Sequence, residues 1–194
     1  MRGARIDDAE ITDWALAAGA GDRNAATAFV TATQSDLLRF LTYLAGPGLA
    51  EDLAQETYLR AMGALPSFEG RSGARTWLLA IARRVAVDHI RSVTRRPRAA
   101  DLPDWQAAAE STRGGQQAGF EDALLLGALV RALPDERREA FVATQILGMS
   151  YDEAAEVCDC PVGTIRSRVA RARTDLAAAL DSTGLRRRGT RRAG

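Results

Sequence analysis

The stretch CPVGTIRSRVARAR, residues 160–173, decides how the C-terminal part of the chain folds. It holds four arginines, whereas the whole chain of 194 residues has a formal net charge of only +1. On a helix, at about 100° per residue, four apolar side chains share one narrow stripe: Ile165, Val169, Ala172 and Leu176. The spacing predicts an amphipathic helix from about residue 161 to about residue 180, with this stripe against a core.

The opposite face of this expected helix carries short polar groups with arginines around them. Short side chains permit close approach to a DNA groove, arginine can bond a guanine edge twice, and flanking arginines can meet phosphates. The alternative, an ordinary solvated basic face, is what a charge run alone would favour. The candidate contacts to a DNA groove are Thr164, Arg166, Ser167, Arg168, Arg171 and Arg173.

The residues before this helix decide between the two interpretations. Ser150, with Glu153 three residues later, forms the S-x-x-E pattern of a capping box and predicts a short helix over 151–158. The sequence CDC at 158–160 is the expected turn, although a glycine is more usual there. Pro161 suits the first turn of the second helix because its missing N–H has no intrahelical partner anyway. Together these signals favour a DNA-binding helix-turn-helix.

The rest of the chain also reads as helical, because alanine and leucine dominate and β-branched runs are scarce. We therefore predict an all-α protein of two small helical domains joined by a flexible linker. The domains are expected at 6–94 and 120–182, with the Pro- and Gly-containing linker at 95–119 and a basic, disordered tail at 183–194. The expected helices are 8–18, 22–45, 49–65, 74–94, 120–132, 135–147, 151–158 and 161–180.

Charge is segregated along the C-terminal half. Residues 120–160 hold three basic and nine acidic groups, a net of −6, while residues 161–194 hold nine basic and two acidic groups, a net of +7. This contrast implies a polyanionic partner for the end of the chain.

Several other classes of protein are disfavoured. No apolar run approaches the roughly 20 residues that span a bilayer, and the N-terminus is too acidic for a signal peptide, so we expect a cytoplasmic protein with no membrane insertion. Cys158, Cys160 and the distant His89 do not complete a zinc site, and we expect no metal and no cofactor. The chain lacks a Walker loop, a carboxylate cluster and a positioned nucleophile, so we expect no enzyme.

The expected helix at 49–65 has an unusual outward face. Asp52, Gln55, Glu56 and Leu59 fall opposite the apolar stripe of this helix. An exposed leucine among carboxylates is typical of an interface with a small apolar centre and a charged rim. A solvated acidic face is the alternative.

Three blocks of this sequence resemble bacterial extracytoplasmic-function (ECF) sigma factors. ALPDERREAFVATQILGMSYDEAAEVCDCPVGTIRSRVARARTDL resembles their domain that binds the promoter −35 element. AEDLAQETYLRA at 50–61 resembles their helix that binds core polymerase, and GARTWLLAIARRVAVDHIR resembles their −10-recognition helix. The resemblance covers roughly residues 25–95 and 120–180, and it is strongest to the actinobacterial sigma-C-type branch.

This resemblance implies an alternative sigma factor that binds core RNA polymerase through the β′ clamp helices and the β subunit. It would read −35 as duplex DNA and capture an unstacked non-template base at −10. The resemblance also implies that an anti-sigma factor is a possible partner. One departure from the family is Arg84, because Ala82-Arg83-Arg84 stands where the family usually reads ARN. The implied −10 pocket and helix comprise Phe68, Glu69, Gly70, Arg71, Arg75, Trp77, Arg83 and Arg84.

A stand-alone helix-turn-helix regulator with an N-terminal dimerisation or sensor domain is the alternative function. Such a regulator binds duplex DNA tightly by itself, at a palindrome whose half-sites are about 34–36 Å apart. A sigma factor binds weakly alone and becomes specific with core enzyme.

Overall fold

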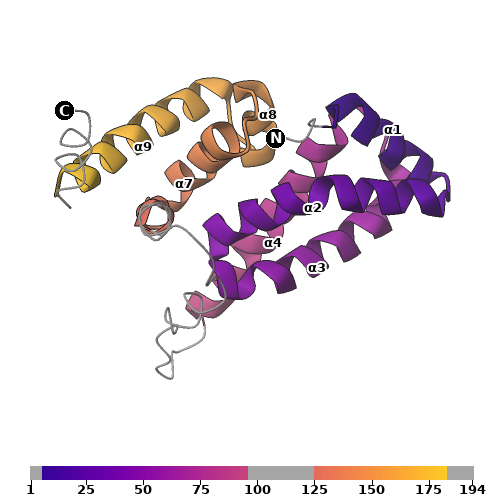
Figure 1. The fold of residues 1–194 in the computed structure, drawn as a ribbon, viewed down its shortest axis with the longest axis horizontal. Coiled ribbons are helices and arrows are strands. Elements are labelled where there is room, and N and C mark those ends of the chain that lie inside the picture. Colours follow the sequence, from indigo (N-terminus) through magenta and orange to yellow (C-terminus); the bar gives the residue numbers. More distant parts are fainter. Residues whose placement is uncertain (1–5, 96–124, 183–194) are drawn as a thin grey trace, which may run out of the picture. The chain divides into compact units, whose positions relative to one another are not determined.

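A computed structural model of the chain describes residues 6–95 and 125–182. The described residues are helical with short connections and contain no strand, so the predicted all-α fold is confirmed (Figure 1). The chain divides into two compact units, with α1–α4 in the first and α7, η2 and α9 in the second. The predicted linker beyond Arg95, including Trp105, and the predicted tail at 183–194 lie outside the described residues.

The first unit contains the four helices that the periodicity predicted. Their observed ends lie within about two residues of the expected ones, as is usual for helix boundaries. The elements are α1 (Asp8–Gly19), α2 (Arg23–Ala45), α3 (Pro47–Ala64), the 3-10 turn η1 (Leu65–Ser67) and α4 (Ala74–Arg95).

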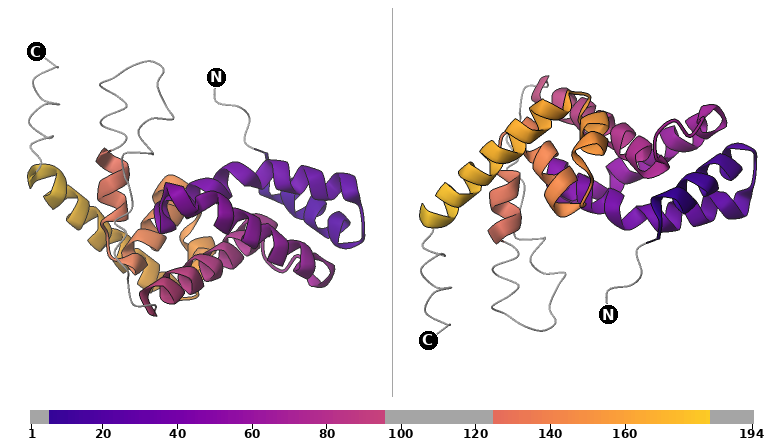
Figure 2. Two further views of the ribbon diagram at one scale, coloured as in Figure 1. Left: turned by 90° about the horizontal axis from the view of Figure 1, so that it is seen from below. Right: turned by 90° about the horizontal axis from the view of Figure 1, so that it is seen from above.

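The core of the first unit surrounds α2, which packs against α1, α3 and α4. The two views of Figure 2 show α1 running alongside α2. Helix starts are fixed locally: the Asp7 carboxylate accepts a hydrogen bond from the Ala9 amide, and the Asp22 carboxylate accepts from the Asn24 amide at 2.8 Å. Large fully buried side chains include Phe29, Leu37, Phe40, Leu41, Leu78 and Leu79.

One polar pair lies inside this helical core. The Tyr58 hydroxyl of α3 is 2.9 Å from the Thr33 hydroxyl of α2, and it donates to the Val30 carbonyl oxygen at 3.2 Å. Burial raises the pKa of the Tyr58 phenol above its ordinary value, although the hydrogen bond with Thr33 acts in the opposite direction. The pair satisfies two polar groups that would otherwise be costly to bury.

The second unit begins with helical residues 125–131 and continues with α7 (Asp135–Phe141), η2 (Val142–Ile146) and α9 (Val162–Ser182). The helix expected at 135–147 therefore exists, but its second half is wound as a π-helix. Helix α8 (Tyr151–Cys158) has the predicted bounds. No helix among the described residues has the length and apolarity needed to cross a membrane.

Arg138 ties the start of α7 to the end of the preceding helix. Its Nη1 donates to the carbonyl oxygens of Arg131, at 2.7 Å, and Leu133, at 3.3 Å, while its Nη2 pairs with Asp135 at 2.6 Å. Carbonyls at a helix C-terminus lack intrahelical partners, so the guanidinium supplies what the backbone cannot. This connection positions α7, and α7 packs against α9.

Candidate nucleic-acid interface

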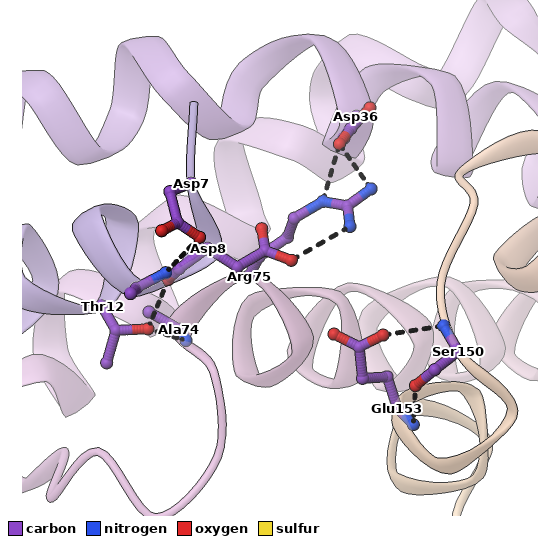
Figure 3. A network of polar contacts seen from close by, with 9 residues as sticks. Asp7, Asp8, Thr12, Asp36, Ala74, Arg75, Ser150 and Glu153 are labelled. Carbon is purple, nitrogen blue, oxygen red and sulfur yellow. Dashed lines mark hydrogen bonds and ion pairs between the residues drawn. The ribbon is translucent and has the colours of Figure 1, made fainter. Parts of the chain in front are cut away.

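The predicted capping box is present at the start of α8. The Glu153 carboxylate accepts from the Ser150 amide at 2.7 Å, and the Ser150 hydroxyl accepts from the Glu153 amide at 3.2 Å (Figure 3). Each side chain thus satisfies the other residue's backbone N–H. The box fixes where α8 begins.

The turn before α9 needs a left-handed residue, and the sequence supplies an aspartate. Asp159 has φ of 51°, in the conformation that glycine usually occupies but that aspartate tolerates. Helix α9 begins at Val162, with the Pro161 carbonyl oxygen accepting from the Thr164 amide at 2.8 Å. The absence of glycine from CDC is therefore accommodated by Asp159.

Helix α9 divides into two faces as the spacing predicted. The buried stripe is confirmed: Ile165, Val169, Ala172 and Leu176. Opposite it, Arg166, Ser167 and Arg171 are exposed and Thr164 is partly exposed. A groove of about 350 Å³ runs between this face and the first turn of α7, and its lining includes Thr164, Ser167 and Arg171 from α9.

Arg168, a predicted DNA contact at the flank of this face, is held by two protein partners. Its side chain is only 16% exposed, its Nη2 lies 2.8 Å from Glu136 Oε2, and its Nη1 lies 3.4 Å from the Cys160 sulfur. Because its guanidinium is engaged with α7 and the turn, Arg168 connects two parts of the unit. It also lines the groove beside Thr164, Ser167 and Arg171, and its contact with DNA stays a prediction.

Arg173 of α9 is exposed and, like Arg168, has a hydrogen-bond partner within the protein. Arg173 Nη2 donates to Gln145 Oε1 of η2 at 2.8 Å, and Gln145 Nε2 in turn donates to the Thr144 hydroxyl. Arg137 of α7 pairs with Asp175 of α9 at 2.6 Å. These contacts hold α7 and η2 against α9. The exposed Arg166 and Arg171 therefore belong to a helix whose position is fixed by its neighbours.

The outward face of α3 carries the four side chains of the predicted interface. Leu59 is 71% exposed, the highest fraction among the exposed large apolar side chains of the described residues. Asp52 and Gln55 are exposed, and Glu56 is partly exposed because its carboxylate accepts from Arg60 Nε at 2.8 Å. The structure therefore presents a leucine ringed by polar and acidic groups.

The loop at 68–73, between η1 and α4, carries the expected rim of a −10 pocket. The rings of Phe68 in this loop and Trp77 in α4 lie 4.8 Å apart, tilted by 40°. Arg71 Nε lies 3.0 Å from Glu69 Oε2, and both side chains are largely exposed. Gly70 has φ of 69°, which a residue with a Cβ rarely adopts. An aromatic pair, an exposed ion pair and a tight turn thus lie together.

The structure removes Arg75 from the candidate DNA contacts. Its side chain is 5% exposed, with Nε and Nη2 both 2.7 Å from Asp36 Oδ2 of α2 and Nη1 3.8 Å from Asp8 of α1 (Figure 3). A buried guanidinium bound to two carboxylates holds helices together instead of meeting DNA. Arg84 is exposed and Arg83 partly exposed on the same helix.

Sequence reasoning missed the partners of these arginines and one distant cap. Thr12 of α1 accepts a hydrogen bond from the Ala74 amide at 3.0 Å, at the first residue of α4 (Figure 3). One feature of the sequence could have indicated this distant cap: Gly73, directly before α4, has no side chain that could cap the helix locally. Glu136 and Gln145 had no pattern that linked them to α9.

Comparison with known proteins identifies the family. Residues 29–96 match the family described as Sigma-70 region 2, and residues 123–176 match Sigma-70, region 4. The chain is 50% identical over 178 residues to the ECF RNA polymerase sigma factor SigC of Mycobacterium tuberculosis, covering 92% of this chain and 95% of that protein. It is 32% identical over 162 residues to the ECF RNA polymerase sigma-E factor of Escherichia coli K12, covering 79% and 85%.

Two solved structures have a similar fold. One is CnrH in complex with the cytosolic domain of CnrY, with a TM-score of 0.68 and 24% identity over 89% of this chain and 98% of that one. The other is the sigma factor RpoE in complex with the anti-sigma factor NepR from Bartonella quintana, with a TM-score of 0.64 and 25% identity over 82% and 98%.

The chain therefore belongs to the extracytoplasmic-function RNA polymerase sigma factors, and the resemblance to the sigma-C-type branch is confirmed. It is an alternative sigma factor that works with core RNA polymerase and promoter DNA in transcription initiation.

Proposed function

We propose that three surfaces of this sigma factor divide the work of promoter selection. The exposed face of α9 reads −35, the outward face of α3 binds core polymerase, and the loop at 68–73 with α4 captures a −10 base. The protein itself catalyses no reaction and acts in the cytoplasm. The proposed domains are 6–94 and 120–182, joined at 95–119.

At −35, the proposed base contacts are those of Arg166, Ser167 and Arg171, with Thr164 at the helix start. The observation that carries the proposal is the two-faced α9, whose apolar stripe is buried while these side chains face outward. Small residues beside exposed arginines fit the major groove, where an arginine can bind a guanine with two hydrogen bonds. Arg173, held by Gln145, is suited to a phosphate.

At the polymerase, the proposed contact is Leu59 with Asp52, Gln55 and Glu56 around it, facing the β′ clamp helices. A leucine that is 71% exposed loses contact with water when a partner covers it, which favours binding. The acidic groups around Leu59 favour a partner whose matching surface is basic. The β subunit is a further proposed partner.

At −10, Phe68, Glu69, Gly70 and Arg71 form the proposed rim of a base pocket, with Trp77 as the aromatic wall. Taking a base out of the stack costs a few kcal/mol, which aromatic stacking and polar contacts can offset. Arg83 and Arg84 are proposed to meet the backbone of the captured strand. CnrH and RpoE were solved with protein partners, and we propose that an anti-sigma factor also restrains this chain.

Transcription in vitro tests the proposal directly. Purified core polymerase is supplied with the wild-type chain, with Leu59→Arg or with no addition, on a genomic promoter pool. We expect defined start sites with wild type only, and loss of those starts when −35 or −10 is scrambled. Start sites that do not depend on the added chain would refute the proposal. Tight, palindrome-specific binding by the chain alone would favour a stand-alone regulator.

A further inference from the structure

Helix α1 contacts the segment 65–74, which contains the loop at 68–73, at both of its ends and in its middle. At the start, Gly19 lies so close to η1 that an added Cβ would stand 2.5 Å from the Leu65 carbonyl oxygen. In the middle, a Cβ on Gly70 would stand 3.5 Å from a Leu16 methyl carbon. At the end, the Thr12 hydroxyl accepts from the Ala74 amide at 3.0 Å.

These three contacts come from one face of α1. Residues 12, 16 and 19 are spaced by four and three positions, so they follow one another along the same side of a helix. Helix α1 lies before residues 29–96, which are the part that matches Sigma-70 region 2. The contacts therefore come from outside the matched region and meet a segment inside it.

The Thr12 contact substitutes for a missing local cap. The Gly73 carbonyl oxygen accepts the first intrahelical bond, from the Trp77 amide at 2.9 Å, but Gly73 has no side chain for the free amides of the first turn. Ala74 is fully buried, so its amide needs a protein partner. Thr12 donates its own proton to the Asp8 carbonyl oxygen at 2.8 Å, which leaves its lone pairs for Ala74.

The first turn of α4 has a second set of contacts with the neighbouring helices. Arg75, next to Ala74, pairs with Asp36 of α2 and lies 3.8 Å from Asp8 of α1 (Figure 3). The end of the loop is thus fixed in direction as well as in position, and Trp77, whose ring contacts Phe68, follows in the same turn.

We propose that Thr12 and Leu16 of α1 are positioning residues for −10 recognition, because they set the geometry of the loop at 68–73 against α4. This inference rests on the proposed placement of the −10 pocket. Neither residue touches the captured base. Each acts through the loop, so its loss changes discrimination at −10 and leaves −35 reading and core binding as they were.

The experiment compares transcription from a promoter and from the same promoter with one −10 base changed, using purified core polymerase. Thr12→Val and Leu16→Ala should lower this −10 discrimination about fivefold, the scale of one lost hydrogen bond or small packing contact. Thr12→Ser, which keeps the hydroxyl, should stay within about twofold of wild type. Leu126→Ala is the matched control, since Leu126 is 48% exposed in the second unit.

Two further measurements separate positioning from a general loss of structure. Core co-purification and the ratio between native and scrambled −35 promoters should be unchanged in Thr12→Val and Leu16→Ala. If these fall in proportion to −10 discrimination, the two residues are merely structural and the inference is wrong. Leu16→Ala keeps the test meaningful should Thr12→Val fold poorly.

Trp77→Ala distinguishes the two levels of the proposal. If Trp77→Ala loses −10 discrimination while Thr12→Val and Leu16→Ala keep it, the positioning role is refuted and the −10 pocket stands. If all three variants discriminate like wild type, the pocket itself is misplaced, and the inference about α1 is refuted with it.

Discussion

Arg168 and Arg171 lie three residues apart on one helix and differ in exposure and in their partners. Arg168 is 16% exposed and pairs with Glu136 at 2.8 Å, whereas Arg171 is exposed beside Ser167 in the groove. Replacing each by alanine should therefore produce opposite phenotypes. Arg168→Ala should lower the stability of the unit and keep promoter preference. Arg171→Ala should keep the stability and lower promoter preference.

The magnitudes follow from exposure. Glu136 is 71% exposed, so its ion pair is worth about 1 kcal/mol or less, and the partly buried stem of Arg168 adds a similar amount. A loss of about 1–2 kcal/mol lowers the melting temperature of a unit of this size by roughly 4–15 °C. Arg171→Ala should change stability by less than about 0.5 kcal/mol. It should cost roughly 5- to 150-fold at one −35 base pair.

Thermal unfolding followed by circular dichroism measures the first effect, and transcription on every single −35 substitution measures the second. Glu136→Ala completes a double-mutant cycle with Arg168→Ala, whose coupling energy should approach about 1 kcal/mol. The reasoning is refuted if Arg168→Ala relaxes preference at one base pair while the melting temperature stays constant. An equal loss by Arg171→Ala on all −35 sequences would make Arg171 a phosphate contact.

Three further changes test other parts of the molecule. Reversing both charges at Asp52 and Glu56 should abolish co-purification with core polymerase without unfolding the first unit; retained co-purification would place the polymerase contact elsewhere. Ser150→Ala should cost about 1 kcal/mol in thermal unfolding because it removes one half of the capping box, and an unchanged melting temperature would contradict this. Arg75→Met should destabilise the first unit by up to about 3 kcal/mol, since Asp36 and Asp8 lose the Arg75 guanidinium; a loss of −10 preference at full stability would restore Arg75 as a DNA contact.

Local sequence signals predicted the helices well. The periodicity of apolar residues located α1–α4, and the Ser150–Glu153 pair set the start of α8, because both signals depend on residues within one or two turns. The π-helical winding of η2 lay beyond this reasoning, since no breaker marks Val142–Ile146 and the expected α-period continues through it.

The role of each arginine depended on residues far away in sequence. Asp36 lies 39 positions before Arg75, and Glu136 lies 32 positions before Arg168, so no helical spacing connects the members of either pair. Arg168 was a predicted DNA contact because its neighbours on the helix suited that task, and Arg75 because its helix resembles the −10-recognition helix of the family. Only the packing of α2 against α4 and of α7 against α9 revealed the carboxylates.

Composition makes this ambiguity sharper in this chain, because all 26 basic residues are arginine. In a chain that also uses lysine, arginine at a bidentate or buried site stands apart, since only arginine offers a planar fork and is weakly hydrated. Here arginine fills three different positions. Arg138 caps the end of a helix, Arg75 forms a buried ion pair between helices, and Arg171 lies on an exposed face. Exposure and pairing, rather than the number of positive charges, therefore decide which arginines remain available for a promoter.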